Sequence, residues 1–328
     1  MKASFLSRLF AVSFFFYSAV SVSYAGHDNE LNYVTKEVKV SKITSISTTR
    51  AVDVSYYQTA GKPRVEIYAP DYLLHSINVS DVNGDLQISM KSQDAGNSYF
   101  SFTKDCDFEV RVYAPDVFSF SSGLASSIKF PDGLSTKRNV FIEVKGGGVV
   151  QGGAIKCRVL QISAEQSGDI DLGNVTCDDA DVKAKTKAKV KIGCLMSKLA
   201  DIGSSSSSVC SVDALITEKE AKFCTITSGT INVSGMNCRG RIFVQSSTSG
   251  ETILEGACEE GVLNAAEAGK ISASSMTSKK MEVVSVTGGD VTCQTSGKLK
   301  VEIDKISSVK YTGNPKKISG DKKRAIRF

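Results

Sequence analysis

Tryptophan is absent from this chain of 328 residues, and histidine (2) and proline (5) are scarce. With two histidines and no Cys-x-x-Cys pair, few ligands are available for a transition-metal site. The sequence also contains no Ser–His–Asp grouping, no redox dithiol motif and no Gly-Lys-Ser/Thr phosphate loop. These motifs carry most nucleophilic and nucleotide-dependent catalysis. We therefore expect no cofactor, no metal and no enzymatic activity.

Long apolar runs are missing too, apart from one near the N-terminus. Lys2 and Arg8 precede the apolar stretch 9–22, and Ser23-Tyr24-Ala25 matches a signal-peptidase site. Residues 1–25 are therefore predicted to be an export signal. An uncleaved anchor is the alternative, although the stretch is shorter than the ~20 residues that a membrane span needs. We expect an exported protein with no transmembrane segment in its mature chain.

Charge of one sign is not in large excess. The net charge of +5 is spread along the chain, which is too mild to indicate nucleic acid. The exception is the segment 316–328, which we predict to be a frayed, solvated basic tail. Before it we expect one domain, with an N-terminal β region at 26–120 and β-helix repeats at 121–315.

Glycine, serine, valine, threonine and isoleucine are abundant, which is the chemistry of strands and turns. Small residues recur at steps of about twenty, at Gly148, Gly168, Ala188, Ser208, Gly229, Gly250, Gly269 and Gly288. Such a period is typical of a solenoid, because one rung cannot bury its own apolar face. The sequence predicts an all-β, right-handed parallel β-helix with rungs of about twenty residues. The glycines would form its corners by accepting positive φ. An antiparallel β-sandwich is the alternative, and it would not need the constant step.

The N-terminal region contains more local signals. Asn83-Gly84 between alternating runs predicts a hairpin. Residues 71–77 resemble a short helical turn. A loop is expected at 93–107, with an aromatic cluster at 99–102 that forms either a binding patch or a satellite core.

Nine cysteines are present, and seven recur about once per rung: Cys157, Cys177, Cys194, Cys210, Cys224, Cys238 and Cys258. Equivalent positions of a solenoid stack at about 4.8 Å. We therefore expect a buried ladder of mostly reduced thiols acting as small apolar side chains. The spacing would also permit some disulfides.

Alternating lysines mark the run 182–192. The five are Lys183, Lys185, Lys187, Lys189 and Lys191. A strand with this pattern would carry a cationic outer face, and its partner could be an anionic glycan or lipid head group. A solvated strand that resists edge aggregation is the alternative. Nearby acids form two groups, Asp169 with Asp171, and Asp178, Asp179 and Asp181. Paired carboxylates could hold Ca²⁺ or act as acid and base in a glycan-active enzyme, but these fall in turns or on solvent-facing positions.

Several motifs taken in order resemble the head GIN domain of putative autotransporter adhesins. They are 46–58, 62–67, 82–90, 110–115, Ser122-Gly123 and 309–315. The likeness spans about 38–315. It implies a right-handed β-helical fold and placement in the periplasm or on the surface of a Gram-negative bacterium. It supplies no catalytic residues. The expected function is non-catalytic binding or adhesion at the cell envelope. The alternatives are a glycan-active β-helix enzyme and a purely structural envelope protein.

Overall fold

The computed structural model describes residues 32–91 and 108–328. Within these ranges the chain is almost wholly β, with one 3-10 turn, η1 (Asp71–Leu73), and no α-helix. The predicted export signal at 1–25, the loop at 93–107 and its aromatic cluster lie outside the described residues. A search of the described ranges for a helix long and apolar enough to span a membrane finds none.

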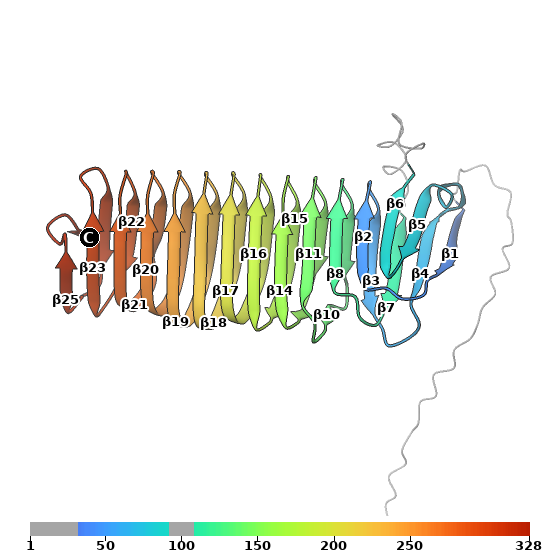
Figure 1. Ribbon diagram of the computed structural model, residues 1–328, viewed down its shortest axis with the longest axis horizontal. Helices are drawn as coiled ribbons and strands as arrows, with labels where there is room; N and C mark the ends of the chain where they lie inside the picture. The colour runs from blue at the N-terminus through green and yellow to red at the C-terminus, as the bar shows by residue number, and fades with distance from the viewer. Residues whose placement is uncertain (1–31, 92–107) are drawn as a thin grey trace, which may run out of the picture. The chain divides into compact units, whose positions relative to one another are not determined.

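Most strands belong to a stack of parallel rungs, which Figure 1 shows from the side. Each rung contributes one strand to a first face, one to a second face and a short piece to a third. The first face begins with β2 (Ser45–Thr49), β8 (Ser119–Gly123), β11 (Val140–Lys145), β14 (Val159–Ala164) and β16 (Asp179–Lys185). The second begins with β3 (Asp53–Gln58), β9 (Ser127–Phe130), β12 (Val149–Gly152) and β15 (Asp169–Thr176). The third begins with β10 (Leu134–Ser135) and β13 (Ile155–Lys156).

In the middle of the stack, one long strand runs through all three faces. These strands are β17 (Lys189–Ser205), β18 (Val209–Ile226), β19 (Thr230–Ser246), β20 (Glu251–Ala265) and β21 (Lys270–Ser285). Each pairs in parallel with the next, and the partners are about twenty residues apart, as in Asp169↔Lys189 and Lys189↔Val209. The parallel β-helix with rungs of about twenty residues is thus confirmed, and the antiparallel sandwich is excluded.

The interior is built from columns of equivalent apolar residues. One column on the first face pairs in unbroken register and consists of Leu86, Ile46, Phe120, Ile142, Ile162, Val182, Ile202, Phe223, Val244, Leu263, Val283 and Val301. Each of these side chains is buried. The outward residues between them are mostly polar, because successive side chains of a strand point to opposite faces. Stacking therefore pools apolar faces that a single rung would leave in water.

The corners between the first and second faces work differently from the prediction. Two consecutive residues take positive φ at each corner, and most are not glycine, for example Gln166 and Ser167. The glycine stands one position later and its own φ is not positive. A Cβ on Gly229 would lie 2.2 Å from the Ser204 carbonyl oxygen, in the rung below. Glycine is thus used for close approach of rungs, and the expectation that it supplies positive φ is wrong for Gly148, Gly168, Gly229, Gly250 and Gly269.

Gly288 does not belong to that set. Lys270 pairs with Asp290, so the residue in register with Gly269 is Gly289. A Cβ on Gly289 would lie 2.5 Å from the Ala265 carbonyl oxygen. Gly288 instead has φ +78 and is the second residue of its positive-φ pair, after Thr287. The predicted corner position was therefore wrong by one residue.

In the N-terminal region, antiparallel strand pairs cover the first end of the stack. Its remaining strands are β1 (Tyr33–Lys39), β4 (Arg64–Pro70), β5 (Ile77–Val82), β6 (Asp85–Met90) and β7 (Glu109–Ala114). The predicted Asn83-Gly84 hairpin is confirmed, because β5 pairs antiparallel with β6 and both turn residues have positive φ. The predicted helical turn is present as η1 at the start of 71–77.

The order of rungs in space differs here from their order in the sequence. β2 pairs in parallel with both β6 and β8, and β3 pairs with both β7 and β9. The rung of β2 and β3 therefore lies between the rung that contains β6 and β7 and the rung that contains β8 and β9, and both of these come later in the chain. No division of the stack occurs near residue 120, because pairing is continuous across it.

The last strands continue the stack. They are β22 (Asp290–Gln294), β23 (Lys298–Ile303), β24 (Ser308–Thr312), β25 (Lys317–Gly320) and β26 (Ile326–Arg327). β25 pairs with β23, and β26 pairs with β24. The segment 316–328 is therefore the final rung, and the prediction of a frayed tail is wrong because its backbone is paired.

Candidate binding surfaces

The five lysines of the predicted cationic strand do not share a face. Lys183 and Lys185 end β16 on the first face, whereas Lys189 and Lys191 begin β17 on the second. Between them Thr186 and Lys187 form a corner with φ of 54 and 63. The expectation of one straight strand is therefore wrong.

Acidic groups also neutralise part of this run. Lys183 Nζ lies 2.5 Å from Asp201, and Lys185 Nζ lies 3.4 Å from Glu165. Asp169 and Asp171 pair in register with Lys189 and Lys191 of the next rung. Asp178 binds Lys198 at 2.7 Å. The two groups of acids thus point to different faces and each faces lysines, so they do not converge as a pair of catalytic carboxylates would.

The cysteines occupy several columns. Cys157, Cys177, Cys238 and Cys258 share one column at the corner after the third face, together with Ser197, Thr217 and Ser278. Cys194 lies in a column with Asn174 and Ala214, Cys210 with Val190 and Ile231, and Cys224 with Gly203 and Gln245. Cys194 and Cys224 are only half-buried. A single buried ladder of seven thiols is therefore wrong, because most gaps between the cysteines differ from the length of a rung.

Two adjacent thiol pairs remain in the shared column. Cys238 pairs in register with Cys258, and both line a groove of about 480 Å³. Contact with the Cys177 thiol lowers the pKa of the Cys157 thiol, against the opposing effect of burial. Neighbouring strands are about 4.8 Å apart, which lies within the Cα separation that a disulfide accepts.

We therefore expect mild oxidation with diamide to give two disulfides, Cys157–Cys177 and Cys238–Cys258. Each pair of thiols loses two hydrogens to diamide as the S–S bond forms, and diamide is reduced to the hydrazine. Peptide mapping by mass spectrometry of unreduced, alkylated protein would detect both bridges. Cys210 and Cys293 serve as internal controls, since both are buried and neither has a cysteine in register. Bridges formed equally at these two positions would contradict the assignment.

A surface that the sequence did not reveal lies at the N-terminal end. The sheet β1–β4–β7–β3 presents an outward cluster, named here the tyrosine–arginine face: Tyr33, Tyr57, Arg64, Tyr68, Arg111 and Tyr113. Its residues come from four strands, and the register places Arg64 beside Tyr113 and Tyr57 beside Tyr113. Tyr68 is 37% exposed, and the other three tyrosines are half-buried.

The rings and guanidinium groups of this face contact one another. Tyr57 and Tyr113 stack at 5.1 Å with 17° between their planes, and Tyr33 stacks on Tyr68 at 5.1 Å. The Arg64 guanidinium carbon lies 3.8 Å from the centre of the Tyr113 ring. Stacked rings and cation–π contacts of this kind restrict the side chains to a few rotamers.

Carboxylates complete the face. Arg64 Nε binds Glu66 at 3.0 Å, and Arg111 Nε binds Glu109 at 2.8 Å. Burial favours protonation of Glu109, but hydrogen bonds from Ser55 and Arg111 outweigh it and lower the pKa of the carboxyl. The Tyr113 hydroxyl has a raised pKa because of burial and the nearby Glu66. The face is therefore close to neutral overall, and it offers aromatic rings, hydroxyl groups and guanidinium donors to a ligand.

A weak signal for this face exists in the sequence. Each of its members sits at an outward position of an alternating strand, where an exposed aromatic side chain is unusual. Their assembly could not be inferred, because β4 and β7 pair antiparallel and β3 joins them from an earlier part of the chain.

A hollow of about 410 Å³ between β1 and β5 is a second candidate. Ile67 and Ile77 form its floor, and Lys36, Lys39 and Lys91 stand at its rim. Lys36 pairs with buried Ile67 and so belongs to the inward side of an edge strand. An inward lysine on an edge strand opposes pairing with other chains, which explains this arrangement without a ligand.

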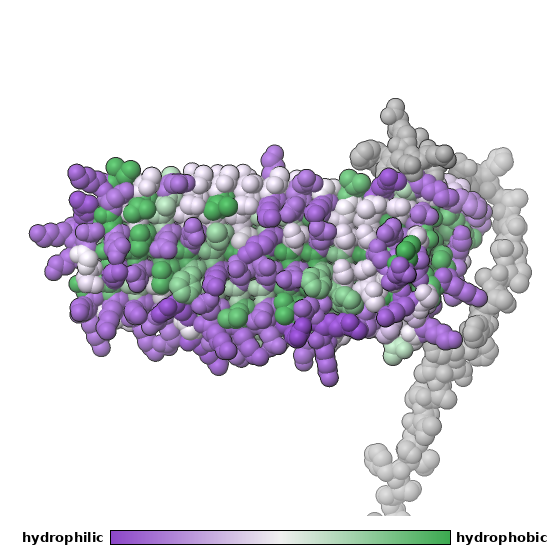
Figure 2. Space-filling view, in the orientation of Figure 1, coloured by the Kyte–Doolittle hydropathy of each residue, from purple (hydrophilic) through white to green (hydrophobic). Residues whose placement is uncertain are grey.

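On the side drawn in Figure 2, apolar residues are interspersed with hydrophilic ones along the stack. Among the described residues, no group of three or more histidine, cysteine or acidic side chains could hold a metal ion.

Comparison with known families gives one match. The profile described as "Putative auto-transporter adhesin, head GIN domain" matches residues 42–215 and 191–315. No curated protein is significantly similar to the chain.

Solved structures give distant likenesses. A putative adhesin of Bacteroides fragilis is 16% identical, with 90% of this chain and 93% of that chain covered and a TM-score of 0.29. A putative lipid-binding protein of Parabacteroides distasonis is 14% identical, with coverage of 90% and 97% and a TM-score of 0.41. A putative adhesin of Parabacteroides merdae is 12% identical, with coverage of 90% and 93% and a TM-score of 0.33. At these scores the likenesses carry no argument about function.

Proposed function

This chain belongs to the "Putative auto-transporter adhesin, head GIN domain" family, and from that membership we propose an exported, non-catalytic binding protein of the cell envelope. The name of the family supports adhesion to a surface component. The apolar run followed by Ser23-Tyr24-Ala25 supports export. We place the binding site on the tyrosine–arginine face and assign it a glycan as ligand.

The observation that carries this proposal is the pair of stacked tyrosines with arginine held against them. Tyr57, Tyr113 and Arg64 form one row of the face, and Arg111, Tyr68 and Tyr33 form another. Aromatic rings contact the apolar C–H groups of sugars, while guanidinium and hydroxyl groups can bond to sugar hydroxyls. Because their contacts already fix these side chains, little conformational entropy is lost on binding.

Binding of labelled full-length protein to a printed array of bacterial and animal glycans would test the proposal. Tyr57→Ala and Tyr113→Ala should each weaken binding to the best glycan at least about 10-fold, as for central aromatic residues of an interface. Tyr72→Ala is the control, since Tyr72 is 50% exposed and lies outside the face. Circular dichroism would verify that each variant keeps its fold.

Three results would count against the proposal. Equal binding by the Tyr57, Tyr113 and Tyr72 variants would remove the face as the site. Release of sugar fragments over time would favour the glycan-active enzyme. Binding to no glycan would favour the purely structural envelope protein.

A further inference from the structure

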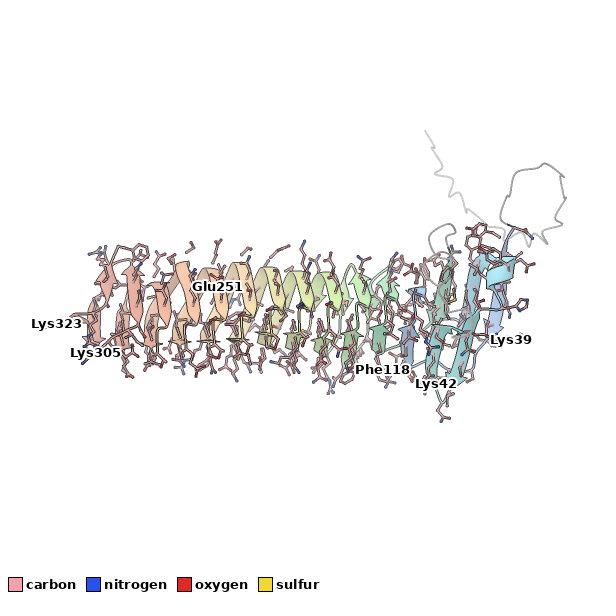
Figure 3. All side chains as sticks on the ribbon, turned by 90° about the horizontal axis from the view of Figure 1, so that it is seen from above. Lys39, Lys42, Phe118, Glu251, Lys305 and Lys323 are labelled. Carbon is pink, nitrogen blue, oxygen red and sulfur yellow. The ribbon has the colours of Figure 1, made fainter. Side chains whose placement is uncertain are left out.

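The charge of this protein is concentrated at the end of the stack opposite the tyrosine–arginine face. Residues 298–328, named here the basic end, hold ten lysine and arginine residues against three acids, a net charge of +7. The net charge of the whole chain is +5, so all other residues together carry −2. Figure 3 places Lys305 and Lys323 at this end and Lys39 and Lys42 at the other.

The positive charge of the basic end is not neutralised within the protein. From residue 310 onward all five lysines are exposed and form no ion pair with any described residue: Lys310, Lys316, Lys317, Lys322 and Lys323. Of the three acids, Glu302 pairs with Lys300 at 2.9 Å, and the other two are engaged with the backbone. Asp321 accepts the N–H of Ile303 at 3.1 Å, and Asp304 accepts those of Thr287, Ile306 and Ser307.

Large apolar side chains stand among these lysines. Ile306 is 73% exposed, Ile326 58% and Phe328 60%. Their backbone is ordered: Ile306 lies in the turn held by Asp304, and Ile326 pairs with Lys310. Lysines on the last strands also discourage edge-to-edge pairing. Exposed isoleucine and phenylalanine have the opposite effect, so protection of the edge does not explain the combination.

We propose that the basic end docks on a bilayer surface that carries anionic phospholipid headgroups. Clustered lysines supply the attraction to an anionic surface, and a few apolar side chains enter the interface; stable peripheral binding usually needs two such signals together. Ten corners at about 4.8 Å each separate the two ends by roughly 50 Å. The tyrosine–arginine face would therefore lie at the end of the stack opposite the docked end. The inference does not depend on the proposed glycan site.

Co-sedimentation of the full chain with vesicles would test this. Vesicles of phosphatidylcholine with about 30% phosphatidylglycerol should bind it, and phosphatidylcholine alone should not, with binding lost as salt rises to about 0.5 M. Replacing the five exposed lysines by glutamine should weaken binding at least about 100-fold. Ile326→Ser with Phe328→Ser should weaken it about 10-fold.

The lysine run at 183–191 provides a matched control. Glutamine at Lys183, Lys185, Lys187, Lys189 and Lys191 removes the same charge, yet should change binding by no more than about 3-fold, because these lysines are spread over a corner and partly ion-paired. Equal losses in the two variants would show a net-charge effect and overturn the proposal. Tight binding to a soluble anionic polysaccharide or duplex DNA without binding to vesicles would overturn it too. Tyr57→Ala should bind vesicles normally. The vesicle assay therefore distinguishes a failure of the membrane proposal from a failure of the glycan proposal.

Discussion

Gly256→Ala is expected to lower the free energy of unfolding by about 3 kcal/mol or more. Gly256 has φ +126, a conformation that residues with a Cβ rarely adopt, and forcing it costs about 1–3 kcal/mol. The new Cβ would also lie 2.1 Å from the Met236 carbonyl oxygen, so the neighbouring rung must shift, which costs a similar amount. Guanidinium unfolding followed by circular dichroism would measure the change.

The conformation of Gly256 has its origin in the length of its rung. The step from Gly250 to Cys258 is one residue shorter than the equivalent step from Gly229 to Cys238. The pairing of β19 with β20 absorbs the difference, because its register shifts between Val233 and Met236. This β-bulge places two residues opposite one and requires unusual backbone angles.

Gly153→Ala is the matched control for this experiment. Gly153 also lies in the stack and its φ is not positive, and beyond its two chain neighbours no atom lies within 4 Å of the place that a Cβ would take. The substitution should leave stability unchanged or raise it by up to about 1 kcal/mol, by restricting the unfolded chain. Similar unfolding midpoints for the two variants would refute the role of Gly256.

Phe120→Ala is expected to lower the free energy of unfolding by about 3–5 kcal/mol, the usual cost of emptying a buried aromatic site. Phe120 is 1% exposed and packs against Phe130 at 4.6 Å and Tyr56 at 5.5 Å between ring centres. These three rings fill the interior where β3, β8 and β9 meet. Chemical denaturation would measure the loss.

Phe141→Ala is the control, because Phe141 lies on the next rung but is 40% exposed. It should cost no more than about 1 kcal/mol. If Phe120→Ala does not fold, Phe120→Leu should still fold and lose about 1–2 kcal/mol. Equal costs for the alanine variants at 120 and 141 would contradict the assigned packing.

The lysine run illustrates the limit of sequence patterns. Lysine alternates with other residues from Val182 to Ile192 although the chain turns a corner within this run. The corner uses two residues, so even-numbered positions point inward both before and after it, and Ala184 and Ala188 are both buried. No local feature of the run distinguishes a straight strand from a bent one. The cysteines were more informative, since only the gaps of twenty, 157 to 177 and 238 to 258, equal the rung and join register partners.

The sequence by itself determined the parallel stack, because a rung pairs with the next one residue by residue, and the number of residues per turn is therefore written in the chain as a period. Tertiary structure alone decided how the chain turns at each corner and how Tyr33, Tyr57, Tyr68 and Tyr113 reach one surface. These depend on antiparallel pairing and on a rung inserted out of chain order, which are contacts between distant segments that no local pattern records.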